Sequence, residues 1–208
     1  MDISRRTFTA TALTSTAVAV AGCFGSSADE IALEGDSELP IAVAGDPDAD
    51  VTVMAFEDYG CGGCASYKTN VYPDIKAAYI DSGQIRYEQR DFPIPADNEW
   101  SWEIASAARS VQEQGDDDAF WEFTENIYTH FGEYSLDDVR AVADDVGVDG
   151  EQVVEAVEDG RFRDELEAEK ERAEDAGVQA TPTVVVDGQT VDEPLSDDGV
   201  ESDIEDAL

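Results

Sequence analysis

Two cysteines that directly follow an apolar run constrain this chain more than any other feature. Residues 51–56 (VTVMAF) have compact β character, which predicts a buried strand. The pair Cys61-Gly62-Gly63-Cys64 follows, and a helical stripe then begins, with Pro73 expected to kink or interrupt it. The stripe consists of Cys64, Tyr67, Val71, Ile75 and Ala78. The sequence therefore predicts a strand, a turn that carries the cysteines, and a helix.

The spacing of Cys61 and Cys64 suits a redox dithiol, half of a metal site or a structural disulfide. A structural zinc site takes four ligands, but the chain has no second cysteine pair and a single histidine, His130. A zinc site within one chain is therefore not expected, whereas a site between two chains or a copper site stays open. A disulfide within four residues restrains the unfolded chain little, which argues against a structural staple.

The redox interpretation has a direct physical basis at this turn. Cys61 is expected at the N-terminus of the helix, where free backbone N–H groups and the helix dipole favour a thiolate. Cys64 is expected one turn later, on the same face and nearer the core. We therefore expect Cys61 to be the nucleophile and Cys64 to resolve the mixed disulfide.

The N-terminus has the layout of an export signal. Arg5 and Arg6 precede a weakly apolar run over residues 7–21, which is too short and polar for a transmembrane helix. Residues 4–8 resemble a twin-arginine signal, and residues 20–23 (VAGC) resemble a lipobox. We expect residues 1–22 to be a signal peptide and Cys23 to be lipidated, with residues 23–38 as a flexible tether. The mature chain then keeps two thiols, Cys61 and Cys64.

The rest of the chain predicts an α/β fold with an inserted block of helices. One domain is expected from residues 39–96 and 178–208, and the helical insertion from residues 97–177. Strands are predicted at residues 39–44, 51–56 and 84–92, and a hairpin at residues 183–191 around Asp187-Gly188. Helical spacing covers residues 100–114, 117–130, 136–146, 152–176 and 197–207.

The charge of the chain excludes one class of partner. With 50 acidic and 12 basic residues the formal net charge is −38, so nucleic acid would be repelled. The hydrophobic content of 42% and the periodic segments indicate a folded protein rather than a disordered one. So many acidic residues with only three lysines suggest adaptation to high salt, where screening reduces self-repulsion.

The layout from residue 51 to residue 208 resembles the DsbA family of thioredoxin-like proteins, particularly its membrane-anchored archaeal and Gram-positive members. Four segments carry the resemblance: residues 56–59 (FEDY), the CGGC pair, residues 90–93 (RDFP) and residues 177–183 (GVQATPT). The resemblance implies a thioredoxin-like fold with a helical insertion. It also implies Cys61 as nucleophile, Cys64 as resolving cysteine, and Thr181-Pro182 as a cis-proline loop that faces the substrate.

Two positions depart from the pattern of that family. Many thioredoxin relatives have a buried acid six residues before the first cysteine, where Ala55 stands here. Glu57 and Asp58 lie nearer the turn, where their side chains can face solvent. Gly62 and Gly63 add no side-chain donor between the cysteines, so the direction of electron flow stays open.

We therefore expect an extracytoplasmic thiol–disulfide oxidoreductase, anchored to the outer face of the membrane through Cys23. It is expected to oxidise cysteines of exported proteins and to be reoxidised by a membrane redox partner, without a cofactor or bound metal. The alternatives are a disulfide reductase for haem or copper assembly, a copper-binding lipoprotein, and a structural lipoprotein with an inert cysteine pair.

Other conspicuous residues are expected to be structural. The aromatic residues of the helical block are assigned to core packing: Trp100, Trp102, Phe120, Trp121, Phe123, Tyr128 and Phe131. His130 is expected at the surface or as a cap, and the acidic stretches 116–118 and 197–198 are expected to be solvated because they lack calcium-loop spacing.

Overall fold

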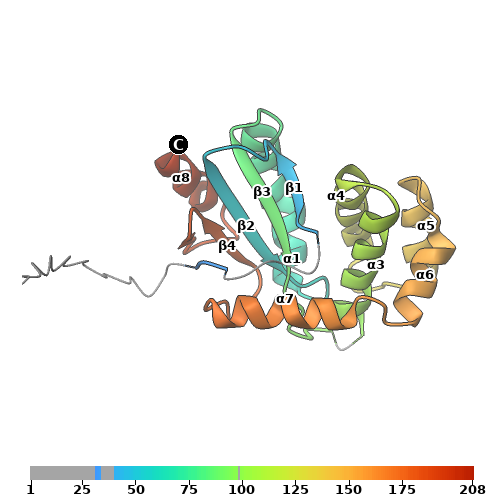
Figure 1. Ribbon diagram of the computed structural model, residues 1–208. Coiled ribbons are helices and arrows are strands. Elements are labelled where there is room, and N and C mark those ends of the chain that lie inside the picture. Colours follow the sequence, from blue (N-terminus) through green and yellow to red (C-terminus); the bar gives the residue numbers. More distant parts are fainter. Residues whose placement is uncertain (1–30, 34–39, 98) are drawn as a thin grey trace, which may run out of the picture.

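The computed structural model describes residues 31–33, 40–97 and 99–208, and it has the α/β architecture that the sequence predicts. The proposed signal peptide, Cys23 and most of the predicted tether lie outside the described residues. Five strands form one sheet: β1 (Ala42–Gly45), β2 (Val51–Glu57), β3 (Ile85–Asp91), β4 (Thr183–Val186) and β5 (Gln189–Thr190). Their order is β1-β3-β2-β4-β5, so that β2 lies at the centre (Figure 1).

The register of the sheet determines which residues meet at each end. β2 pairs with β3 in parallel, and β4 runs antiparallel to β2 with Phe56 opposite Thr183. The end of β2 that leads to Cys61 is therefore the end at which β4 begins. The predicted hairpin is confirmed: Asp187 and Gly188, with φ of 46° and 83°, join β4 to β5 in a two-residue turn.

One long helical segment follows the dithiol, and its geometry changes along its length. It comprises α1 (Gly62–Ser66), a π-helical turn (Tyr67–Val71), α2 (Tyr72–Ile75) and a second π-helical turn (Lys76–Ile80). Each π turn accommodates extra residues and shifts the buried face. Ala78, predicted on the buried stripe, is therefore exposed, and Tyr79 and Ile80 are buried in its place.

The helical block contains five α-helices between β3 and β4. They are α3 (Trp100–Gln114), α4 (Asp117–Ile127), α5 (Leu136–Asp145), α6 (Gly150–Glu158) and α7 (Arg163–Asp175), with a 3₁₀ turn at Tyr128–His130. The side chains of Asp116, Ser135 and Asp149 cap α4, α5 and α6. The prediction of one helical segment over residues 152–176 is wrong, because Gly160, with φ of 61°, lies in the break between α6 and α7.

Different elements cover the two faces of the sheet. The helical segment after the dithiol and α8 (Asp197–Ala207) pack on the face that carries Val53 and Val184. The other face, with Phe56 and Val185, is covered by Ala173 of α7 and by Ile31. In Figure 1 the helices α3 to α6 gather beside the β1 edge, while α7 runs back across the sheet.

Part of the segment predicted to be a flexible tether lies against this second face. Ile31 is 6% exposed, and its N–H donates a hydrogen bond to the carbonyl oxygen of Gly188 at 2.6 Å. Leu33 packs against the same apolar cluster, which also contains Phe92 and Val178. Residues 31–33 are therefore attached to the domain beside the β4–β5 turn.

Core packing of the aromatic residues is confirmed for most of the helical block. Trp102, Phe120, Trp121, Phe123 and Tyr128 are buried. Trp100 is half-buried, but Phe131 is 39% exposed. Within the described part of the chain, no helix has the length and apolar character needed to cross a membrane.

Candidate active site

The strand–turn–helix transition places the two cysteines in different environments. Cys61 is the N-cap residue of α1, with extended backbone (φ −90°, ψ 123°), and its side chain is half-buried. Cys64 lies in the first turn of α1 and is fully buried. Both are free thiols in this structure, so the geometry is that of the dithiol form.

The surroundings of Cys61 stabilise a thiolate. A hydrogen bond from the Cys64 thiol contributes most, and the N–H groups of Cys64 and Gly63 add to it. Burial acts in the opposite direction but is outweighed, so that the pKa of Cys61 is lowered from 9.0 to about 5. Cys61 therefore has the properties of an attacking or leaving sulfur at neutral pH.

Cys64 shows the opposite behaviour. Burial raises the pKa of its thiol far above the ordinary value, and the hydrogen bond to Cys61 and the charge of Glu57 raise it further. One contact opposes this: the N–H of Asp58 donates to the Cys64 sulfur at 3.4 Å. The pair thus consists of an accessible thiolate and a buried thiol.

A loop from the far end of the chain completes the site. The Thr181-Pro182 peptide bond is cis, and the Thr181 carbonyl oxygen lies 3.4 Å from the Cys61 sulfur, 120 residues away in sequence. A Cβ atom added at Gly63 would stand 3.0 Å from Cδ of Pro182. The loop and the dithiol turn are therefore in direct contact, because β4 begins beside the end of β2.

Two surfaces with apolar side chains lie near the dithiol turn. A hollow of about 640 Å³ is lined by Thr181, Pro182, Glu193, Pro194, Leu195 and Ser196. Leu195 is 52% exposed. The partly exposed ring of Phe131 lies next to Gly62.

A buried ion pair near Cys64 was not predicted from the sequence. The Lys68 ammonium lies 3.5 Å from Oε1 of Glu57, and the Tyr128 hydroxyl donates to Oε2 of Glu57 at 3.2 Å. Burial raises the pKa of Glu57 and lowers the pKa of Lys68.

The expectation that Glu57 and Asp58 can face solvent is wrong, since both are buried. Lys68 lies four residues after Cys64, and this helical spacing was the available signal.

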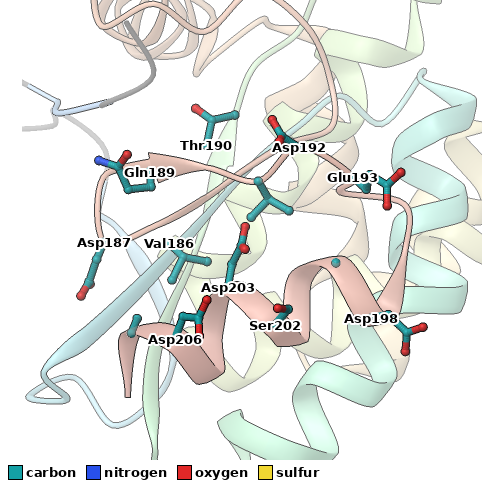
Figure 2. A pocket seen from close by; sticks show the side chains of 13 residues that line it. Val186, Asp187, Gln189, Thr190, Asp192, Glu193, Asp198, Ser202, Asp203 and Asp206 are labelled. Carbon is teal, nitrogen blue, oxygen red and sulfur yellow. The ribbon is translucent and has the colours of Figure 1, made fainter. Parts of the chain in front are cut away.

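A second, larger hollow lies away from the dithiol. It has a volume of about 880 Å³ and lies between the β4–β5 hairpin and α8 (Figure 2). Its carboxylates come from both elements and from the loop between them: Asp187, Asp192, Glu193, Asp198, Asp203 and Asp206. Neither cysteine lines it.

Neither His130 nor the carboxylates extend the site. His130 is partly exposed, and its Nδ1 lies 3.1 Å from Oδ1 of Asp138. Across residues 31–33, 40–97 and 99–208, no three His, Cys, Asp or Glu side chains are grouped closely enough to hold a metal ion.

The fold and the dithiol have counterparts in known proteins. The profile of the Thioredoxin family matches residues 38–206. Probable disulfide bond formation protein D of Bacillus cereus is 28% identical over 155 residues, which are 69% of this chain and 68% of that protein. Disulfide bond formation protein D of Bacillus subtilis is 25% identical over 172 residues, or 80% of this chain and 76% of that protein. The crystal structure of oxidised BdbD from Bacillus subtilis superposes with a TM-score of 0.76 at 23% identity, covering 86% of this chain and 98% of that chain.

Proposed function

We propose, from the premise that this chain belongs to the thioredoxin family and is a DsbA-like thiol–disulfide oxidoreductase, that it oxidises cysteine pairs of exported proteins through Cys61 and Cys64. The observation that carries the direction of the reaction is the pKa of Cys61, about 5. A stabilised thiolate stabilises the dithiol form and so makes the disulfide form a stronger oxidant. The names of the two Bacillus relatives, disulfide bond formation protein D, agree with this direction.

The reaction proceeds by two exchanges. A client thiolate attacks the Cys61 sulfur of the Cys61–Cys64 disulfide, which forms a mixed disulfide and releases Cys64 as a thiolate that takes up a proton. A second client thiolate then attacks the client sulfur of the mixed disulfide, and Cys61 leaves as a thiolate. The client loses two electrons and two thiol protons, and the enzyme gains the two electrons as a dithiol. The low pKa of Cys61 makes it the better leaving group in the second step.

Glu57 and Lys68 are proposed to move the proton of Cys64. A Cys64 thiolate is costly inside the protein, and the charge of Glu57 acts on it directly. Burial raises the pKa of Glu57 and lowers the pKa of Lys68, so the Glu57 carboxylate accepts a proton, and the Lys68 ammonium releases one, more readily than in water. The pair would perform the role of the buried acid that many thioredoxin relatives have six residues before the first cysteine, where this chain has Ala55.

The client is proposed to bind along the Thr181-Pro182 loop. The hollow beside Pro182 and Leu195 and the partly exposed ring of Phe131 provide apolar contacts near the dithiol turn. Such surfaces suit unfolded segments, which expose apolar side chains around their cysteines.

The cellular setting follows from the N-terminal motifs. We propose that lipidated Cys23 holds the protein on the outer face of the membrane, where a membrane redox partner reoxidises the dithiol, and that the acidic surface suits a high-salt environment. Cys23→Ser is expected to release the mature protein from membranes into the medium. Retention of this variant on membranes would count against the lipid anchor.

Two measurements test the proposed function. Cys64→Ser should accumulate client proteins in disulfide linkage to Cys61, and the matched variant Cys61→Ser should accumulate none. The reduction potential in high salt should lie near the value of a strong oxidant, about −120 mV, rather than near the thioredoxin value of about −270 mV. If Cys64→Ser forms no adducts, the proposal of an oxidoreductase is wrong. If adducts form but the reduction potential of the Cys61–Cys64 pair is about −270 mV, the protein acts as a reductase.

A further inference from the structure

Asp58 is a buried carboxylate between β2 and the dithiol turn. It is fully buried, and its oxygens accept hydrogen bonds from three backbone N–H groups. Oδ1 accepts from Gly60 at 2.7 Å, and Oδ2 accepts from Ile94 at 2.9 Å and from Ala96 at 3.3 Å. Three such hydrogen bonds fix the position of the carboxylate inside the protein. The side chain therefore joins the dithiol turn to the segment that follows β3.

The backbone of the same residue contacts the buried sulfur. The N–H of Asp58 donates to Cys64 Sγ at 3.4 Å, which is within the range for a sulfur acceptor. In the mixed disulfide Cys61 carries no thiol proton, so it cannot donate to Cys64. The Asp58 N–H then stays in place as a donor to a sulfur that solvent does not reach.

Close packing leaves this N–H little freedom. A Cβ atom added at Gly60 would stand 2.7 Å from the backbone nitrogen of Asp97 and 2.5 Å from Oγ of Ser101. The turn at residues 58–60 and the segment at residues 94–97 therefore touch through backbone atoms. The Asp58 carboxylate also connects the two segments through its hydrogen bonds from Ile94 and Ala96. The direction of the Asp58 N–H therefore depends on both segments.

We propose that Asp58 is a positioning residue for the thiol–disulfide exchange: its carboxylate fixes its own N–H toward the Cys64 sulfur, where the N–H stabilises the thiolate that leaves when the disulfide opens. This inference rests on the proposed function of Cys61 and Cys64. In the step concerned, the client sulfur bonds to Cys61 and the Cys61–Cys64 bond breaks. Its electron pair goes to Cys64, which accepts the Asp58 hydrogen bond until it is protonated. A fixed donor aimed at developing negative charge lowers the barrier without reorganisation.

The same contact acts in the reverse direction. When the Cys64 thiolate attacks the mixed disulfide, the Asp58 N–H favours formation of that thiolate. Displacing the N–H should therefore slow both opening and closing, and it should move the pH dependence of closing to higher pH. A purely structural role would lower the stability of the fold without shifting this pH profile.

Asp58→Asn is the first test, because asparagine keeps the size of the side chain but turns an amide donor toward backbone N–H groups. Ring opening is measured by stopped flow, with reduced glutathione added to the oxidised protein, and ring closing from the glutathione adduct of Cys61. We expect opening to slow by about tenfold, which is less than the roughly hundredfold or greater loss caused by removing such a donor, because Asp58→Asn displaces the N–H without deleting it. The pH profile of closing should move up by about one pH unit.

Asp117→Asn is the matched control. Asp117 also accepts a backbone N–H from another segment, that of Val43 at 3.2 Å, but it does not contact the dithiol. This variant should lose stability and keep the rates and pH profile of the wild type. If Asp58→Asn behaves in the same way, the positioning role is overturned.

A measurement on the wild-type protein covers the case in which Asp58→Asn does not fold. The amide proton of Asp58 should be protected from exchange and should shift in the NMR spectrum when the disulfide is reduced. An Asp58 amide that exchanges freely in the dithiol form would overturn the inference. If the wild type proves to be a reductase, only the proposed oxidising direction is wrong. The role of Asp58 still holds, because oxidation and reduction of a client both pass through the Cys64 thiolate.

Discussion

The ammonium of Lys68 lies 3.5 Å from the carboxylate of Glu57, and both side chains are buried near Cys64. Lys68 also donates to Oε1 of Gln89 at 2.8 Å and lies over the ring of Tyr72, 4.3 Å from its centroid. The pair is therefore held by neighbours from the sheet and from the helix after the dithiol. In a chain with 50 acidic and 12 basic residues, one of three lysines is committed to this position.

Removing one partner of this pair should destabilise the fold. Lys68→Met leaves Glu57 without its countercharge, and we expect a loss of about 3–5 kcal/mol in the free energy of unfolding. The double variant Glu57→Gln/Lys68→Met should regain much of this loss, because no uncompensated charge stays buried. Denaturant unfolding in high salt measures both. A Lys68→Met variant as stable as the wild type would contradict the buried pair.

The reactivity of the dithiol should titrate near pH 5. The folded pKa of Cys61, about 5, lies below the ordinary thiol value of 9.0, so alkylation of the reduced protein should rise through an inflection near pH 5. Because the unfolded chain holds that proton to higher pH, the reduced protein gains stability above pH 5 and loses it as the pH falls through that value. Cys61→Ser should lack the inflection. An inflection near pH 9 in the wild type would show that Cys61 is not a thiolate at neutral pH.

The two glycines between the cysteines should respond differently to alanine. At Gly63 a Cβ atom would stand 3.0 Å from Pro182 and 3.6 Å from the Cys61 sulfur. At Gly62 the nearest atom, from the Phe131 ring, is 3.8 Å away. Gly63→Ala should therefore slow oxidation of a client peptide several-fold, while Gly62→Ala stays within about twofold of the wild type. Equal rates for the two variants would contradict the contact with the Thr181-Pro182 loop.

Ile31 should stabilise the folded domain although it lies far from the dithiol in sequence. Its side chain is buried against Phe56, Ala173 and Val185, so Ile31→Ala should cost about 2–5 kcal/mol. The neighbouring Ala32 is exposed, and Ala32→Ser should have no measurable effect. Thermal unfolding of the two variants makes the comparison. Equal melting temperatures for Ile31→Ala and the wild type would show that this segment does not dock.

Salt should stabilise the protein. At a formal net charge of −38 the folded state is subject to strong self-repulsion, which screening reduces. We expect the melting temperature to fall steeply as salt is withdrawn. Calorimetry over a salt series tests this, and a sharp transition that keeps its temperature in low salt would contradict adaptation to high salt.

The bounds of helices and turns that depend on a few neighbouring residues were predicted closely from the sequence. The bounds of α3 and α8 coincide with the predicted residues 100–114 and 197–207. The Asp187-Gly188 turn was also predicted, because two adjacent residues with positive φ strongly limit the residues that fit. Helix period and turn chemistry act over a few residues, so they can be read from the chain alone.

The errors arose where a local pattern was modified by its surroundings. Ala78 has the correct helical spacing, yet two π turns moved the buried face to Tyr79 and Ile80. Glu57 and Asp58 follow the buried strand as polar residues at a turn, and nothing local shows that other segments will bury them. Glu57 is covered by Tyr128 and Lys68, whereas Asp58 is held by the N–H groups of Ile94 and Ala96.

The sequence by itself determined the strand–turn–helix that carries Cys61 and Cys64, because apolar periodicity and cysteine spacing are local. It also determined the α/β class and the block of helices between the strands. Only the tertiary structure brought Thr181 within 3.4 Å of the Cys61 sulfur and buried Glu57, Asp58 and Lys68 around Cys64. The contact of Thr181 with Cys61 spans 120 positions, and the contact of Asp58 with Ile94 spans 36. The burial that raises the pKa of Cys64 likewise exists only when these distant segments are packed.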